Sequence, residues 1–186
     1  MANKREDIIE TTCALLESQG YHATGLNQIL KESGAPKGSL YYYFPEGKEE
    51  LAEEAIRRTA ERVERNIRAQ LAGYEDYVEA ITSFIRTIAS YVTEYEFKAG
   101  GPLTTLALES ANTSERLTKA CDRAYSSWCR AFSDILEQNG YPPARAASLA
   151  HLIISVIEGA TVLSRTERST QPIEDAAEEI ARLLKC

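Results

Sequence analysis

The side chains best suited to chemistry lie between residues 37 and 48. A lysine, a glycine, a serine and three consecutive tyrosines follow one another there, directly after a proline that could begin a short helix. Ammonium and hydroxyl groups bind phosphate oxygens, and tyrosine rings pack against sugars or thymine methyl groups. The segment therefore carries the groups that a helix needs to lie against DNA, namely Lys37, Gly38, Ser39, Tyr41, Tyr42, Tyr43 and Lys48.

Two short predicted helices must hold these groups in place. The first covers residues 26–33, with an apolar stripe on one face, and ends before Gly34. The second covers residues 37–43, where Leu40 and Phe44 are four apart and should point into the core. Three tyrosines cannot all be buried in so small a domain. We therefore expect at least two of them to point outward.

Charge alone does not explain DNA binding by this chain. The net charge is −7, and residues 1–48 carry five basic and six acidic groups, a net of −1. Thr24 or Gly25 is expected to cap the helix over 26–33, whose amino end offers free N–H groups and partial positive charge. The amino end of the next helix, which begins at Lys48, should add the same. These helix ends would partly replace the missing basic charge.

The rest of the chain predicts an all-α protein. Apolar residues recur at helical spacing almost throughout, and no strand pattern, internal repeat or low-complexity segment occurs. Glycine and proline residues separate about nine helices. We expect them over residues 4–19, 26–33, 37–43, 48–72, 74–97, 103–111, 114–139, 143–166 and 173–184.

Composition excludes several classes of protein. The chain has 186 residues, 44% of them hydrophobic and 26% charged, which is typical of a soluble globular protein with its own core. No signal peptide opens it, and no apolar run reaches the length of a membrane span, which predicts a cytoplasmic protein. Four cysteines without a CxxC pair predict reduced thiols. Redox sensing by Cys121 and Cys129 is the open alternative.

A bare helix–glycine–helix pattern would fit a simple helical hairpin equally well. The full string GAPKGSLYYYFPEGKEEL, residues 34–51, is more specific. It resembles the recognition-helix signature of the TetR family of one-component regulators, and TGLNQILKESG, residues 24–34, resembles the preceding helix of that family. The Phe-Pro-x-Gly-Lys-Glu variant resembles its LmrA/YxaF-like subgroup. The strong match covers about residues 5–55.

The resemblance implies a fold with two regions of different function. It implies a three-helix helix-turn-helix head, residues 1–48, on a larger helical body for ligand binding and dimerisation, residues 49–186. Within the head it adds Asn27 and Thr24 to the DNA contacts named above. Many members have histidine at the position of Tyr43, so this chain departs from the family pattern at that residue.

The body should hold a small-molecule pocket and a dimer interface. Register and family position point to a pocket for an apolar or aromatic effector. Its candidate residues are Tyr91, Leu106, Glu109, Tyr125, Trp128 and Glu158. The helices over 143–166 and 173–184 carry broad apolar faces and are the expected homodimer interface. The residues named for it are Leu149, Ile153, Val156, Ile157, Ala160, Leu163, Ile180 and Leu184.

The sequence thus predicts a ligand-responsive repressor that binds a palindromic operator on double-stranded DNA as a homodimer. A helical small-molecule-binding adaptor or scavenger with a non-functional head is the alternative. An enzyme that uses Glu109 or Glu158 as a base is a third possibility, which we do not expect because no nucleophile–base pair stands out. Two separated histidines give no metal site, and we expect neither a metal nor another cofactor.

Overall fold

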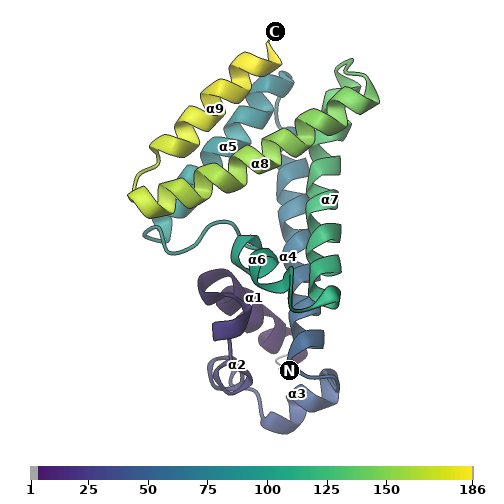
Figure 1. The fold of residues 1–186 in the computed structure, drawn as a ribbon, viewed down its shortest axis with the longest axis vertical. Helices are drawn as coiled ribbons and strands as arrows, with labels where there is room; N and C mark the ends of the chain where they lie inside the picture. Colours follow the sequence, from purple (N-terminus) through teal and green to yellow (C-terminus); the bar gives the residue numbers. More distant parts are fainter. Residues whose placement is uncertain (1–3, 186) are drawn as a thin grey trace. The chain divides into compact units, whose positions relative to one another are not determined.

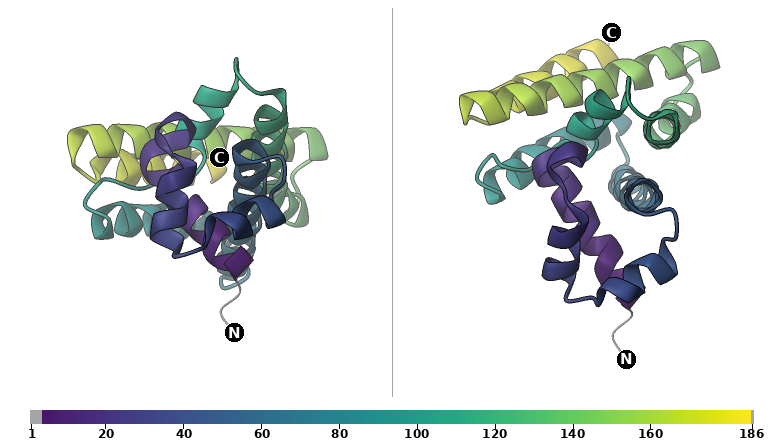
Figure 2. Two further views of the ribbon diagram at one scale, coloured as in Figure 1. Left: turned by 90° about the horizontal axis from the view of Figure 1, so that it is seen from below. Right: turned by 60° about the horizontal axis from the view of Figure 1, so that its bottom comes forward.

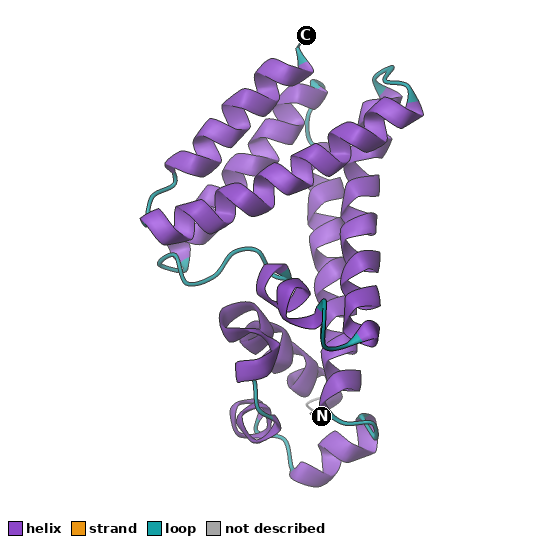
Figure 3. Cartoon of the chain, viewed as in Figure 1, coloured by secondary structure: helices purple, strands orange, loops and turns teal. Residues whose placement is uncertain are grey.

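The computed structural model describes residues 4–185. Over that range it confirms the all-α prediction, since the chain forms nine helices joined by loops and contains no strand (Figures 1 and 3). The helices are α1 (Lys4–Ala23), α2 (Leu26–Ser33), α3 (Lys37–Tyr43), α4 (Lys48–Leu71), α5 (Tyr77–Glu94), α6 (Thr104–Ser110), α7 (Glu115–Gln138), α8 (Pro143–Glu167) and α9 (Gln171–Leu184).

Local signals set most of the helix ends. α2 and α3 begin and end at the predicted residues, because Gly34 adopts the left-handed conformation after α2 and Pro36 precedes α3. α5 begins three residues later than predicted. The Asp76 carboxylate caps it by accepting hydrogen bonds from the backbone N–H groups of Val78 and Glu79, at 2.7 and 3.2 Å.

Gly20 ends the regular part of α1. Its backbone angles are φ 78° and ψ −177°, a conformation that favours glycine, and the helix then makes one more turn to Ala23. The predicted helix over 4–19 is therefore followed by a corner at residues 20–24. This corner leads directly into α2, and side chains from distant parts of the sequence bind to it, as described below.

The chain divides into two compact units, and the first holds the helix-turn-helix. It comprises the residues up to Glu61 together with Pro102–Ala124. α1 packs against α2, α3 and α6, with α2 beside α1 in Figure 2. The unit's core includes fully buried Ile8, Leu40 and Phe44. This core fixes the position of α3, because Leu40 and Phe44 anchor one side of that short helix.

The second unit comprises Arg62–Gly101 and the residues from Tyr125 onward. Its centre is a three-helix layer in which α9 packs against both α5 and α8 (Figure 1). α8 is long and apolar enough to cross a membrane by length and composition. Nine of its residues, among them Leu149 and Ile153, are buried within the protein. The apolar character of α8 is therefore explained by its place in a protein core.

The unit boundary does not coincide with the predicted division at residue 48. By packing, the first part of α4, all of α6 and the first part of α7 belong with the helix-turn-helix. The division into residues 1–48 and 49–186 describes expected roles in DNA binding and in ligand binding, and it stays a prediction.

Candidate DNA-binding site

α3 presents its polar side to solvent. Tyr42 is 80% exposed and Tyr41 is 48% exposed, whereas Tyr43 is half-buried and contacts the edge of the Tyr42 ring at a centroid distance of 5.0 Å. Lys37 and Gly38 at the start of the helix are exposed as well. Two outward tyrosines agree with the expectation from the sequence. A 7-residue helix of this kind can enter a DNA groove with its hydroxyl and ammonium groups foremost.

The amino end of α2 is open. Gly25 occupies the cap position and supplies no side-chain acceptor, so the first N–H groups of the helix are available to an anion. Asn27 lies exposed in the first turn, where its amide can reach the same anion. A phosphate of the DNA backbone has the charge and the oxygen atoms that suit this position.

Thr24 does not act as expected. Its side chain is fully buried, and its hydroxyl donates a hydrogen bond to the carbonyl oxygen of Gly20 at 2.6 Å. It neither caps α2 nor reaches the surface. We therefore correct its assignment from a DNA contact to a structural residue of the corner between α1 and α2.

Lys48 is bound to the same corner. Its Nζ donates to the carbonyl oxygen of Tyr21 at 2.7 Å and lies 4.1 Å from the centre of the Tyr21 ring. Burial lowers the pKa of this ammonium group, while the negative charge of Glu109 acts in the opposite direction. The predicted phosphate ligand thus has a partner within the protein.

Glu109 completes the contacts at the corner. One carboxylate oxygen of this α6 residue accepts hydrogen bonds from the backbone N–H groups of Tyr21 and His22, at 2.5 and 3.2 Å. It was predicted as a residue of the effector pocket. Its contacts place it against the helix-turn-helix, 87 and 88 residues away in sequence from the groups it binds.

A second set of contacts that the sequence did not reveal joins α7 to the turn after α3. Arg116 pairs with Glu46 and Glu53, and Arg123 binds the second oxygen of Glu53 at 2.9 Å. Glu46 lies only three residues beyond Tyr43. These arginines offset negative charge close to the proposed DNA surface. The run of glutamates at 49, 50, 53 and 54 was the available signal that α4 needs basic partners.

The residues predicted to bind the effector fall into two groups. Leu106 is fully buried in the unit that holds the helix-turn-helix, and the partly exposed Glu109 makes its contacts in that same unit. In the other unit, the Tyr125 hydroxyl donates to Glu158 at 3.2 Å, and Trp128 meets the Tyr125 ring edge-on at a centroid distance of 5.2 Å. Tyr125, Trp128 and Glu158 are therefore in contact within one unit.

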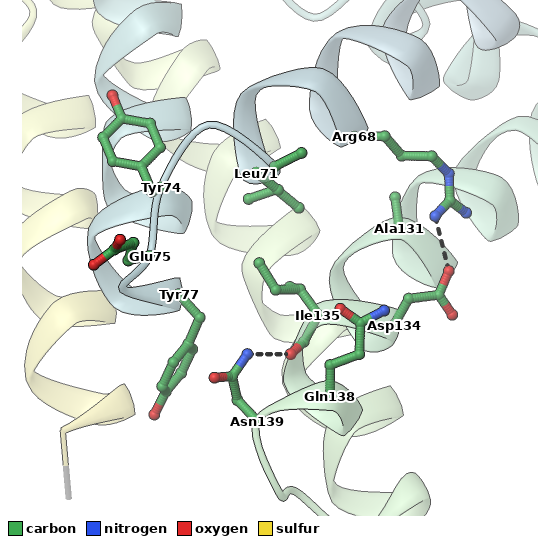
Figure 4. Close-up of a pocket in the computed structure, with 11 residues that line it drawn as sticks. Arg68, Leu71, Tyr74, Glu75, Tyr77, Ala131, Asp134, Ile135, Gln138 and Asn139 are labelled. Carbon is green, nitrogen blue, oxygen red and sulfur yellow. Dashed lines mark hydrogen bonds and ion pairs between the residues drawn. The ribbon is translucent and has the colours of Figure 1, made fainter.

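A crevice of about 390 Å³ opens at the carboxyl ends of α4 and α7 (Figure 4). Leu71 and Ile135 contribute apolar surface, Tyr77 lies to one side, and an ion pair between Arg68 and Asp134 lies to the other. None of the six predicted effector residues lines it.

The apolar residues predicted for the dimer interface are mostly covered within one protomer. Six of them are buried in the second unit, so they form its core: Leu149, Ile153, Ile157, Ala160, Ile180 and Leu184. Val156 is partly exposed and Leu163 is 53% exposed. Leu152 and Val162, which were not predicted, are also exposed, at 43% and 45%. These last four residues form a stripe along α8 that is available to a second chain.

Two short helices packed on α1, the second of them with an exposed lysine and tyrosines, define a helix-turn-helix DNA-binding protein. Comparison with known proteins identifies the family. Residues 8–55 match the model of the bacterial regulatory proteins of the tetR family, and residues 78–179 match that of the LmrA/YxaF-like transcriptional regulator C-terminal domain. The chain belongs to the TetR family of transcriptional regulators, in its LmrA/YxaF-like group.

Curated relatives agree with this assignment, and a solved structure has a similar fold. The chain is 45% identical to the helix-turn-helix-type regulator YxaF and 38% identical to LmrA, both of Bacillus subtilis. Each alignment covers 98% of this chain and 96% or 97% of the relative. A similar fold, with a TM-score of 0.80, 20% identity and coverage of 95% and 94%, is that of the TetR-family regulator CifR in complex with operator DNA. The proteins of this family are transcriptional regulators and not enzymes.

Proposed function

We propose that this regulator is a cytoplasmic homodimer that represses transcription from a palindromic operator and is released from it by a small apolar or aromatic effector. Ligand-responsive repression is typical of the family. The observation that carries the DNA-binding half of the proposal is the exposed surface of α3, where Tyr42 and Lys37 have no place in the core.

Three kinds of contact are assigned to this surface. Lys37 and the open amino end of α2 bind phosphates, and Asn27 assists there. Tyr41 and Tyr42 lie against sugars and base edges in the major groove, because they are the most exposed side chains of α3. Ser39 and Tyr43 are half-buried and contact DNA only at the edge of the surface.

A palindromic operator requires two such surfaces. Two helix-turn-helix units related by two-fold symmetry read half-sites about 34 Å apart. The exposed stripe of Leu152, Val156, Val162 and Leu163 on α8 supplies the interface. We place the effector near Tyr125, Trp128 and Glu158, where an aromatic pair and a carboxylate meet. An effector that changes the spacing of the two units removes the affinity gained from the second half-site.

Fluorescence anisotropy with DNA from the region upstream of the chain's own gene tests the contacts. Tyr42→Ala should weaken specific binding by about 10-fold or more. Lys37→Ala should lower the magnitude of the salt slope of log K by about 1.8, because each of the two protomers loses one phosphate contact worth about 0.9. Lys119→Ala is the matched control, since Lys119 is an exposed lysine on α7 that pairs with Glu115. It should change neither quantity.

Two results would decide against the proposal. Specific binding that tolerates both Tyr42→Ala and Lys37→Ala would show that α3 is not the reading helix. Failure of the wild-type protein to bind this DNA even at low salt would favour the adaptor or scavenger with a non-functional head.

A further inference from the structure

The corner between α1 and α2 has backbone groups that its own helices leave without partners. The bend at Gly20 ends the regular hydrogen bonding of α1, so the N–H groups of Tyr21 and His22 stand at the start of a new turn. At many helix starts, a serine, threonine, aspartate or asparagine side chain just before the turn accepts a hydrogen bond from the second or third N–H group. The preceding residue here is glycine, which has no side chain to offer.

Glu109 accepts both hydrogen bonds from another part of the chain. Its Oε2 lies 2.5 Å from the Tyr21 nitrogen and 3.2 Å from the His22 nitrogen. A carboxylate that accepts backbone N–H groups makes a stronger bond than a neutral acceptor would. A residue of α6 therefore caps the corner. It is 87 and 88 residues away in sequence from the groups it binds, too far for a local capping motif.

The contact requires glycine at position 20. A Cβ atom at position 20 would lie 2.8 and 2.9 Å from the two carboxylate oxygens of Glu109 and 2.9 Å from a methyl group of Thr105. Its φ of +78° would also strain any other residue. The glycine thus supplies both the bend and the space in which the carboxylate sits.

The capped corner in turn determines where Lys48 lies. Lys48 donates to the carbonyl oxygen of Tyr21, the residue whose N–H group is bound by Glu109. The Tyr21 ring also lies below the ammonium group at 4.1 Å. One residue therefore connects Glu109 with Lys48, and α2 starts five residues after it, directly after Gly25.

We propose that Glu109 is a positioning residue for DNA binding: by capping Tyr21 and His22 it sets the place of the amino end of α2 and of Lys48 relative to the operator. It contacts no DNA itself. The inference rests on the DNA-binding function described above. It goes beyond that function, because it assigns a role in DNA binding to Glu109, a residue outside the predicted DNA-binding head of residues 1–48.

The sign of the expected effect separates positioning from simple electrostatics. Removal of a carboxylate close to DNA should strengthen binding if only charge matters, because the DNA backbone is negative. Loss of positioning should weaken binding. Glu109→Ala removes both the charge and the acceptor, whereas Glu109→Gln removes the charge and keeps a carbonyl oxygen that can accept from the same N–H groups.

The experiment measures two quantities for each full-length variant. Amide hydrogen exchange at Tyr21 and His22, followed by NMR without DNA, reports the cap directly. Anisotropy with the upstream DNA reports affinity. We expect Glu109→Ala to accelerate exchange of both amides at least about 10-fold and to weaken DNA binding about 10-fold. Glu109→Gln should stay within about threefold of wild type in both. Glu115→Ala, at an exposed carboxylate on α7, should change neither.

A second variant, Gly20→Ala, disturbs the contact between Glu109 and the corner at residue 20 in place of residue 109. Gly20→Ala should accelerate exchange of the same two amides, and the addition of Glu109→Ala should then have little further effect, because both changes remove one contact. Thermal unfolding of each variant shows which are folded. If Glu109→Ala does not fold, Gly20→Ala decides: accelerated exchange of the Tyr21 and His22 amides together with weaker DNA binding supports the cap, and unchanged exchange rejects it.

Three results would overturn the proposal. The first is unchanged exchange at Tyr21 and His22 in Glu109→Ala. The second is DNA binding by that variant as tight as, or tighter than, that of the wild type. The third is a Glu109→Gln variant that binds DNA as weakly as Glu109→Ala, which would show that a hydrogen-bond acceptor at this position does not set the affinity. If the wild-type protein binds no DNA, the DNA-binding function fails and the positioning role falls with it, while the exchange data still decide whether the cap exists.

Discussion

The Thr24 hydroxyl donates a 2.6 Å hydrogen bond to the carbonyl oxygen of Gly20, and Thr24 is completely buried. It therefore closes the corner between α1 and α2 from the inside, while Glu109 binds its N–H groups from α6. A residue whose sequence position suggested contact with DNA is thus part of the support of the helix-turn-helix.

Thr24→Val should lower the free energy of unfolding by about 1–2 kcal/mol, because the shape is kept and the buried Gly20 carbonyl loses a donor. Urea unfolding followed by circular dichroism measures this. Thr166→Val is the matched control, since its hydroxyl bonds a carbonyl four residues back on an exposed part of α8. That change should stay within about 0.5 kcal/mol. A Thr24→Val protein as stable as wild type, with altered DNA specificity, would return Thr24 to the DNA contacts.

Glu54 forms an ion pair with Arg5 in the first unit, and acid should weaken it. Hydrogen bonds from Arg57 and then from Arg5 lower the pKa of Glu54 from 4.5 to about 2. Because the folded pKa is the lower one, the stabilisation is present above pH 4.5 and is lost as the pH falls toward 2. Arg5 extends from α1 and Glu54 from α4, so protonation loosens these two helices from each other.

Glu54→Gln should therefore lower the free energy of unfolding by about 1–2 kcal/mol at pH 7, after allowance for solvent screening, and by much less near pH 2. Urea unfolding at both pH values measures the difference. Glu115→Gln, on an exposed ion pair of α7, serves as the control and should show little effect at either pH. A loss of stability that is equal at both pH values would contradict this role of the carboxylate charge.

The two cysteines of α7 should be unreactive in the folded protein. Burial raises the pKa of Cys121 from 9.0 to about 11, against a smaller opposite effect of a hydrogen bond with Ser110, and burial also raises the pKa of Cys129. The thiolate is the reactive form, so little of it exists at neutral pH. Iodoacetamide at pH 7.5, followed by mass spectrometry, should label both residues at least about 100-fold faster after unfolding in urea. Rapid labelling of the native protein would revive the redox alternative.

The same pKa shift predicts a loss of stability at high pH. The folded pKa of Cys121 is the higher one, so its contribution is complete below pH 9 and disappears as the pH rises toward 11. Cys121→Ser would remove this dependence but leave a hydroxyl in the buried position. Cys121→Ala is the cleaner variant, and its stability should change less between pH 8 and pH 10.5 than that of the wild type.

The exposed stripe on α8 should hold two protomers together. Leu152→Glu combined with Leu163→Glu should weaken self-association at least about 100-fold, because each change places an unpaired charge in the interface. Sedimentation velocity measures this, and DNA affinity should fall with it. Leu108→Glu is the control, since Leu108 is 75% exposed on α6. A double variant that remains dimeric would move the interface away from this stripe.

The sequence was most informative where structure is local. Gly34 and Pro36 mark the ends of α2 and α3 to the residue, since left-handed glycine and proline act on their own neighbours. The later start of α5 could also have been predicted from Asp76, whose short carboxylate is a strong helix cap. Tyr74 has the same helical spacing as the apolar residues that follow it, and this hid the signal from Asp76.

Contacts between distant residues could not be predicted in this way. Periodicity shows that α8 has apolar residues on most sides, but which of them are covered depends on where α5 and α9 pack. Ile153 and Leu163 look alike in sequence, yet one is 1% exposed and the other 53%. Likewise, nothing local to Glu109 or Lys48 indicates that both bind Tyr21.

The distance along the chain between Tyr21 and Glu109 also bears on synthesis. A ribosome adds about 5–20 residues each second, so the corner emerges several seconds before the carboxylate that caps it. During that interval the nascent helix-turn-helix lacks its partner from α6. The protein therefore acquires a complete DNA-binding surface only after more than half of its length has been translated, although every proposed DNA contact lies within residues 1–48.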